Sequence, residues 1–342
     1  MLEGSFRITE NAVVVTFNLV AAQTAEVILT QHYNRDVTPK AIFEIQEEMA
    51  LMIAVSIADR FGPIGNYADR AAQRGRSLKW DTYHWVCLYH QQTITLSAVD
   101  RSRIKEGLTQ ALEADNTAAD VHATLALILL DEWRTALHDP REGDLLQQAI
   151  LHAELAVARD PQNATAHEAM AMVWFYRKED PLFEASAQTA LDLNPGHSDL
   201  LSMMALCYAI KSDWRKALPL LDEAIALNPL QEGWARSLKV GCLIMMGNHA
   251  AALSELVGSP CPDQLFYHCN MVWVLSEIGD WEKCAYEKDK LLAALPAVET
   301  EILRRVQRLG FEDAWISRAS AAWKQAGLNI SGQGSQNIGA KN

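Results

Sequence analysis

The chain has 342 residues, of which 49% are hydrophobic and 21% are charged, an ordinary composition for a globular protein. Its formal net charge of −13 argues against nucleic acid as a partner, because phosphate binding requires a concentrated basic face. The six cysteines lack CxxC spacing, the N-terminus lacks the order of a signal peptide, and no apolar run is long enough to cross a bilayer. We therefore expect a cytoplasmic protein with reduced cysteines and no membrane partner.

The residue pattern over positions 1–61 predicts a small α+β segment. Alternating or β-branched runs over residues 2–8, 12–21 and 26–33 predict a three-strand antiparallel meander. Thr38 and Pro39 then favour the start of a helix, because threonine caps a helix and proline is tolerated in its first turn. This helix is expected to end near Phe61, where glycine and proline follow.

Residues 62–80 are predicted to be a basic linker. Four cations, Arg70, Arg74, Arg76 and Lys79, lie close together in this stretch. A short basic run of this kind is more often solvated than functional, so we do not assign it to nucleic-acid binding.

An evenly spaced repeat begins beyond the linker. Aspartate–proline or asparagine–proline pairs recur at a constant interval, and an alanine precedes each by the same distance: Pro161, Pro195 and Pro229, with Ala156, Ala190 and Ala224. Only a small residue fits where two helices cross closely, and proline stops the preceding helix. The pattern resembles the tetratricopeptide repeat (TPR), an antiparallel helix hairpin with a period of about 34 residues.

The weaker units on either side extend the array. In this register Ala171 and Ala205 occupy the small site of the first helix, and Trp174 and Tyr208 its aromatic site. About six hairpins are expected over residues 81–298, with one insertion placed in a polar loop at 137–144. Capping helices over 299–328 and a disordered tail over 329–342 complete the predicted fold, a mainly α TPR-type solenoid behind a small α+β segment.

Both ends of the chain resemble a second family. LEGSFRITENAVVVTFNLVAAQTAEVILTQHYNRDV with IFEIQEEMALMIA, and RRVQRLGFEDAWISRASAAWKQAGL near the C-terminus, resemble bacterial TolB-like/TPR signalling proteins. In those proteins the TolB-like domain joins a TPR array to an output module, usually a class III adenylate cyclase or a winged-helix domain. The resemblance implies that half of this domain is missing, so we expect an N-terminally truncated protein or a sheet completed by a second chain.

The concave face of the array is the expected binding site for a protein or peptide, because the first helix of each hairpin lines it. We predict an apolar and aromatic groove with one cation, formed by Met172, Phe175, Tyr176, Leu206, Ile210, Arg236, Val240, Ile244, Phe266 and Trp273. The alternative is that several of these residues pack between neighbouring repeats. Thr165, Glu168, Asp199 and Ser202 occupy the positions at which some TPR domains bind a terminal carboxylate through cations. These four cannot do so, and an apolar or amphipathic partner segment is therefore expected.

The sequence offers no catalytic motif: it lacks a glycine-rich phosphate loop, HExxH and GxSxG. Asp81, His84, Cys87 and His90 could share one helix face as metal ligands, but their spacing drifts, and packing or surface roles are favoured. The repeat pattern alone explains the helical placement of Cys261, His268 and Cys269, so their proximity does not indicate a metal site. The carboxylate pairs Glu47-Glu48 and Asp131-Glu132 are interpreted as solvated faces. We expect no catalytic residue, metal or cofactor.

Two functions follow from these expectations. The first is a non-catalytic scaffold that holds a partner segment in the TPR groove. The alternative is the detached regulatory or sensor half of a TolB–TPR adenylate cyclase or transcriptional regulator, acting on an output domain of another chain. An enzyme whose site escapes motif search is the least favoured interpretation.

Overall fold

The computed structural model describes residues 1–9, 12–22, 24–36, 50, 53, 57, 81–92, 98–114, 118–135, 142–228, 233–259 and 265–330. The chain divides into two compact units, residues 1–200 and 201–342, and the division falls within one helix. The predicted linker lies outside the described residues. So does the predicted helix over 38–61 apart from Ala50, Ile53 and Ile57, which are helical.

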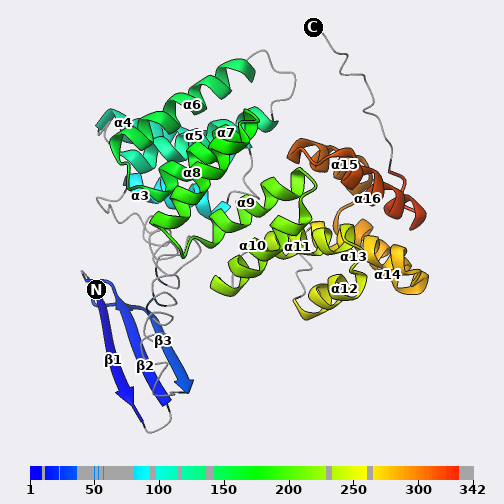
Figure 1. Ribbon diagram of the computed structural model, residues 1–342, viewed down its shortest axis with the longest axis horizontal. Coiled ribbons are helices and arrows are strands. Elements are labelled where there is room, and N and C mark those ends of the chain that lie inside the picture. Colours follow the sequence, from blue (N-terminus) through cyan, green and yellow to red (C-terminus); the bar gives the residue numbers. More distant parts are fainter. Residues whose placement is uncertain are drawn as a thin grey trace. The chain divides into compact units, whose positions relative to one another are not determined.

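The first unit begins with a three-strand antiparallel sheet in the order β1 (Leu2–Ile8), β2 (Ala12–Val20) and β3 (Val27–Asp36) (Figure 1). The predicted meander is confirmed, although β3 extends to Asp36. Leu2 pairs with Leu19 and Leu19 with Leu29, which sets the register across all three strands.

The two faces of this sheet differ in chemistry, as the alternation of side chains along a strand requires. Val13 and Phe17, on the apolar face of β2, are buried, and the Phe17 ring stacks on Tyr33 with centroids 6.0 Å apart. On the opposite face, Thr16 shares a hydrogen bond with His32 at 2.8 Å and Thr30 donates one to Asn18 at 2.8 Å. The sheet therefore has one apolar and one polar face.

The rest of the first unit consists of antiparallel helix hairpins. Its helices are α3 (Asp81–Gln92), α4 (Ala98–Ala114), α5 (Ala119–Thr135), α6 (Glu142–Arg159), α7 (Ala164–Tyr176) and α8 (Asp180–Leu193). The division between the units falls in α9 (Ser198–Ile210).

The second unit continues the same alternation. After α9 it contains α10 (Trp214–Leu227), α11 (Trp234–Met245), α12 (His249–Gly258), α13 (Leu265–Ile278), α14 (Trp281–Ala294), α15 (Val298–Leu309) and α16 (Asp313–Gln325). The segment expected to contain about six hairpins holds helices α3–α14, and the segment expected to cap the array holds α15 and α16. The fold class is confirmed: TPR-type helix hairpins preceded by a three-strand sheet.

Small residues let the helices of each hairpin approach closely. Ala156, Ala190 and Ala224, one period apart, are all fully buried, and Ala171 and Ala205 are buried in the first helices. Polar side chains cap several helices: Asn163 accepts a hydrogen bond from the Ala166 amide at 2.9 Å.

Pro161 lies in the turn between α6 and α7, directly after the helix that it was predicted to stop. Two details differ from the expectations. The insertion mainly lengthens helices, because α5 and α6 have 17 and 18 residues against 13 and 14 in α7 and α8. Composition assigns Asn329 and Ile330 to the tail, but the Asn329 amide donates to Glu299 at 2.6 Å and Ile330 is buried.

Candidate functional site

In the second unit, α16 lies along the face that the repeat pattern assigns to the groove. In the register of the prolines, the groove positions of α13 include Cys269, Trp273, Ser276 and Glu277. Each of these four residues contacts α16 through a ring contact or a hydrogen bond. The face of this hairpin that the repeat pattern assigns to the groove is therefore occupied by a helix of the same chain.

Aromatic rings make the apolar part of this contact. Trp315 of α16 packs edge-on against Trp273, with ring centroids 5.3 Å apart, and lies 5.3 Å from the Trp214 ring. Trp323, two helical turns further on, lies 6.2 Å from the Trp273 ring. Trp273 and Trp323 are almost completely buried, and 6% of Trp315 is exposed.

Gly241 of α11 makes room for Trp315. A Cβ atom at this position would lie 2.0 Å from Cη2 of the Trp315 ring, far closer than carbon atoms can approach. The glycine therefore admits the indole against the α11 backbone, at the cost of helix propensity within α11.

A charged cluster fixes the middle of α16. The Arg318 guanidinium donates to both carboxylate oxygens of Glu277, at 2.8 and 2.6 Å, and to the Met245 carbonyl at 2.9 Å. The Trp273 indole N–H donates to the same carboxylate at 2.7 Å, and His249 Nε2 lies 2.7 Å from it. Burial would raise the pKa of Glu277, but these hydrogen bonds outweigh it, and the pKa is lowered.

Backbone groups fix both ends of the α16 segment. The Trp323 indole donates to the Cys269 carbonyl at 2.9 Å, and the Ser276 hydroxyl donates to the Ala322 carbonyl at 3.0 Å. Before the helix, the Glu312 amide donates to the Ile210 carbonyl at 3.3 Å. The segment thus spans the groove positions of α9, α11 and α13.

Because α16 covers this face, several predicted groove residues in the second unit are buried. Val240, Ile244 and Trp273 are 0–1% exposed and Ile210 is 8% exposed, so these four are core residues here and offer no free surface. Leu206 and Phe266 are half-buried. Arg236, also half-buried, donates to Glu255 at 2.9 Å, so the predicted groove cation already has a carboxylate partner.

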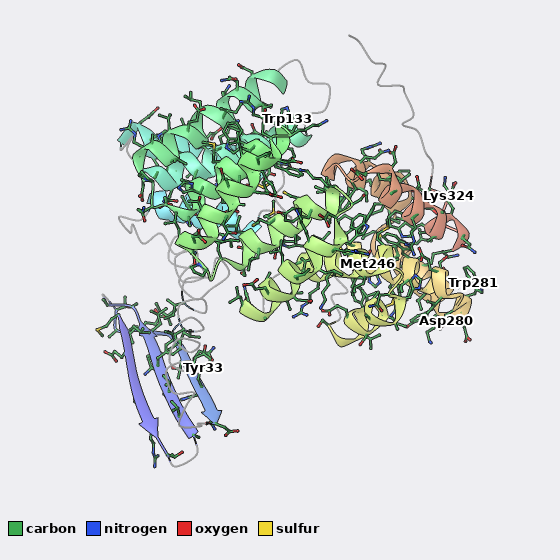
Figure 2. All side chains as sticks on the ribbon, in the orientation of Figure 1. Tyr33, Trp133, Met246, Asp280, Trp281 and Lys324 are labelled. Atoms are coloured by element: carbon green, nitrogen blue, oxygen red, sulfur yellow. The ribbon has the colours of Figure 1, made fainter. Side chains whose placement is uncertain are left out.

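The predicted groove residues of the first unit lie on α7. Met172 and Phe175 are buried, and the Phe175 ring contacts both Tyr176 and Phe183. Tyr176 is half-buried and packs edge-on against Trp133 (labelled in Figure 2) with centroids 5.2 Å apart. Of these three residues, Tyr176 has the most side-chain surface left for a partner.

The four residues at the positions where some TPR domains bind a carboxylate are mostly buried in the structure. Glu168 is 2% exposed and lies 3.4 Å from His197 Nε2. Asp199 and Ser202 are also buried, whereas Thr165 is half-buried. Their burial adds a second reason why a partner's carboxylate would not bind here.

Two of the other residues considered for chemistry have structural contacts. The His84 ring contacts Trp85, and His268 lies 3.2 Å from Glu287. Cys261 and Glu47-Glu48 lie outside the described residues. Across the described ranges, no group of three or more His, Cys, Asp or Glu side chains is arranged to hold a metal ion.

The interpretation of Asp131 and Glu132 as solvated was wrong. Asp131 accepts a hydrogen bond from the Tyr89 hydroxyl at 3.0 Å, and Glu132 pairs with Lys105 at 2.6 Å. Both carboxylates are half-buried, because α3 and α4 pack against α5 and supply partners that are distant in sequence.

The residues that sequence reasoning missed are those of α16. Trp315, Arg318 and Trp323 were part of a predicted cap, and no helix of the chain was expected in the groove. Their spacing of three and five residues places them on one side of a helix, and this was the available signal. No helix among the described residues combines the length and apolar character needed to cross a membrane.

No protein-family model and no curated protein matches the chain. Among solved structures, YrrB, a TPR protein with an unusual peptide-binding site, is 22% identical with a TM-score of 0.40, over 56% of this chain and 94% of its own. The pilF protein of Pseudomonas aeruginosa is 18% identical with a TM-score of 0.45, over 64% and 93%. A TPR protein from Parabacteroides merdae is 10% identical with a TM-score of 0.42, over 85% and 100%. Likenesses this weak carry no information about what this chain binds.

Proposed function

We propose that this protein is a non-catalytic scaffold that binds a helical segment of a partner protein in the concave groove of its TPR-type hairpins. The observation that carries the proposal is the seating of α16 on Cys269, Trp273, Ser276 and Glu277. A face that holds one amphipathic helix through rings, an ion pair and indole hydrogen bonds has the chemistry to hold another.

The residue types in this face support the same function. Tryptophan and arginine are the commonest anchors of protein interfaces, and they dominate the contact between α16 and the groove.

Site-specific photo-crosslinking in cells tests the function. A photoreactive amino acid would replace Tyr176, Leu206 or Phe266 at half-buried groove positions. Matched controls replace Val257 and Tyr286, which are 66% and 61% exposed on the second helices of their hairpins. We expect one polypeptide to crosslink from the groove positions and not from the controls. Equal crosslinking from both sets, or from the controls alone, would remove the groove as the binding face.

We also propose that the sheet is completed by a second chain, as expected for a detached regulatory half. Among the described strands β1 pairs only with β2, and Met1 and Leu2 are 62% and 54% exposed. A strand edge of this kind accepts another strand through its backbone groups. The resemblance to TolB-like signalling proteins makes an output module on another chain the candidate partner.

Sedimentation after mixing this protein with the candidate output chain tests the second proposal. Leu2→Lys is expected to weaken the complex, because lysine at an edge strand disfavours pairing. Val27→Lys, at the opposite edge of the sheet and 56% exposed, is the control. A complex that Leu2→Lys and Val27→Lys weaken equally would exclude the β1 edge.

A further inference from the structure

We propose that α16 is a displaceable occupant of the groove. We further propose that the partner is an amphipathic helix presenting two tryptophans and one arginine with the spacing of Trp315, Arg318 and Trp323. The inference rests on the proposed function and names the chemistry of its partner. It makes α16 a built-in competitor for that partner.

The two sides of α16 match such a role. Trp315, Ala319, Ala322 and Trp323 are at most 6% exposed and recur at helical spacing. The other side is exposed and includes Lys324 (labelled in Figure 2). One side of α16 thus contacts the groove and the other side is exposed, as in other complexes that place an amphipathic helix in a groove.

The hairpins beneath α16 have a core of their own. Ala252 and Leu256 of α12, Val272 of α13 and Leu291 of α14 are buried, and helices α11–α14 pack against one another. The Cys284 thiol of α14 also donates to the Val272 carbonyl at 3.6 Å. Displacement of α16 therefore leaves these helix–helix contacts in place.

The charged cluster determines which helices can replace α16. Glu277 is a half-buried carboxylate whose strongest partner is Arg318, bound through both oxygens. A competitor without an arginine at this position would leave the carboxylate without that cation in a poorly solvated site. An arginine three residues after the first tryptophan and five before the second is accordingly part of the recognised pattern.

Arg318 provides a way to weaken the seating of α16 without changing the groove. Arg318→Gln removes the guanidinium that donates to both carboxylate oxygens of Glu277 and to the Met245 carbonyl. Lys324→Gln is the matched control, because Lys324 lies on the exposed side of α16. Both changes replace a cationic side chain of α16 by glutamine.

The experiment uses the full chain and a fluorescent peptide with the sequence of residues 311–328. Peptides carrying Trp323→Ala or Arg318→Gln are the ligand controls. Anisotropy measures peptide binding, and mass spectrometry follows thiol labelling of Cys269 and Cys242. Both cysteines are buried and burial raises both pKa values, so each reacts only when it is uncovered. Cys269 lies at a groove position under Trp323, whereas Cys242 reports opening of the hairpin core.

We expect the Arg318→Gln chain to bind the unchanged peptide at least about tenfold more tightly than the wild type, and the Lys324→Gln control to match the wild type. Cys269 labelling should accelerate in Arg318→Gln while Cys242 stays protected, and both control peptides should bind more weakly. Equal peptide affinity in Arg318→Gln and the wild type would overturn the proposal. Joint labelling of Cys242 and Cys269 would also overturn it, because α16 would then be an inseparable part of the core. Either result leaves the crosslinking test of the scaffold function unaffected.

Discussion

His122 and His152 face each other across the hairpin of α5 and α6, with their Nδ1 atoms 2.9 Å apart. One of these atoms must donate the hydrogen bond and the other must accept it, so the pair cannot hold a proton on both. Burial, and then the neighbouring His122, lower the pKa of His152 from 6.5 to about 4. The pair therefore stabilises the folded state only while His152 is neutral.

We predict that this hairpin loses stability in mild acid. The folded pKa is lowered, so the contribution is complete above pH 6.5 and is lost as the pH falls from 6.5 towards 4. The full shift corresponds to about 3 kcal/mol, and solvent screening of this half-exposed group reduces the expected loss to about 1–2 kcal/mol. Urea unfolding across this pH range measures it. His152→Asn should flatten the pH dependence, and His167→Gln, in an exposed contact, should leave it as in the wild type.

Lys178 and Gly279 occupy corresponding turns between the two helices of their hairpins. Lys178 has φ +61° and Gly279 has φ +77°, both in the left-handed region that favours glycine. Lys178 therefore adopts a backbone conformation that costs energy for any residue with a Cβ atom.

Exchanging the residue types at these turns should change stability in opposite directions. We expect Lys178→Gly to raise the free energy of unfolding by about 0.5–1 kcal/mol and Gly279→Ala to lower it by about 1 kcal/mol. A Cβ at Gly279 would meet nothing closer than 3.9 Å, so the loss comes from the backbone alone. Urea denaturation checks both, and a stabilising Gly279→Ala would contradict the explanation.

At the scale of elements, Glu277 connects four helices. Its carboxylate takes hydrogen bonds from α13 itself and from α16, and it contacts His249 at the start of α12, while Arg318 also reaches the last residue of α11. An exposed ion pair between Glu301 and Arg305 lies within α15 at 3.0 Å. The two pairs differ in burial and in the number of elements they join.

We predict that Glu277→Gln costs about 1–3 kcal/mol of stability, because it leaves the Arg318 charge half-buried without its carboxylate. Glu301→Gln should cost less than about 0.5 kcal/mol, as is usual for exposed pairs. Because the folded pKa of Glu277 is lowered, its contribution is present above about pH 4.5 and is lost below that. Urea unfolding of both variants at pH 7 and pH 4 measures the difference. Equal losses of unfolding free energy in the two variants at pH 7 would show that the Glu277 cluster stabilises the fold no more than an exposed ion pair does.

For the whole molecule, local patterns predicted most of the fold. The strands followed from alternation, and the hairpins followed from evenly spaced alanines and prolines, because close helix crossings admit only small residues. These patterns reflect interactions between residues close in sequence, so they can be recognised in a single sequence. The longer α5 and α6 were missed, because polar residues at 137–144 resemble a loop and the insertion lengthens the flanking helices.

Contacts between residues far apart in the sequence account for the features that were not predicted. Trp273 was expected to line a partner-binding groove and is fully buried, since α16 returns from much later in the chain to place Trp315 against it. Asp131 and Glu132 likewise found partners on α3 and α4. A single sequence gives the register of each repeat but does not say which helix covers which face.

The contact between α16 and the groove also makes the protein its own optical reporter. Four of the ten tryptophans, at positions 214, 273, 315 and 323, belong to one ring cluster in which three pairs of ring centroids lie 5.3–6.2 Å apart. Indoles this close couple their electronic transitions, and Trp273, Trp315 and Trp323 are buried from water. Departure of α16 would therefore weaken the near-ultraviolet circular dichroism and shift the intrinsic emission to the red, so groove exchange could be followed in unlabelled protein.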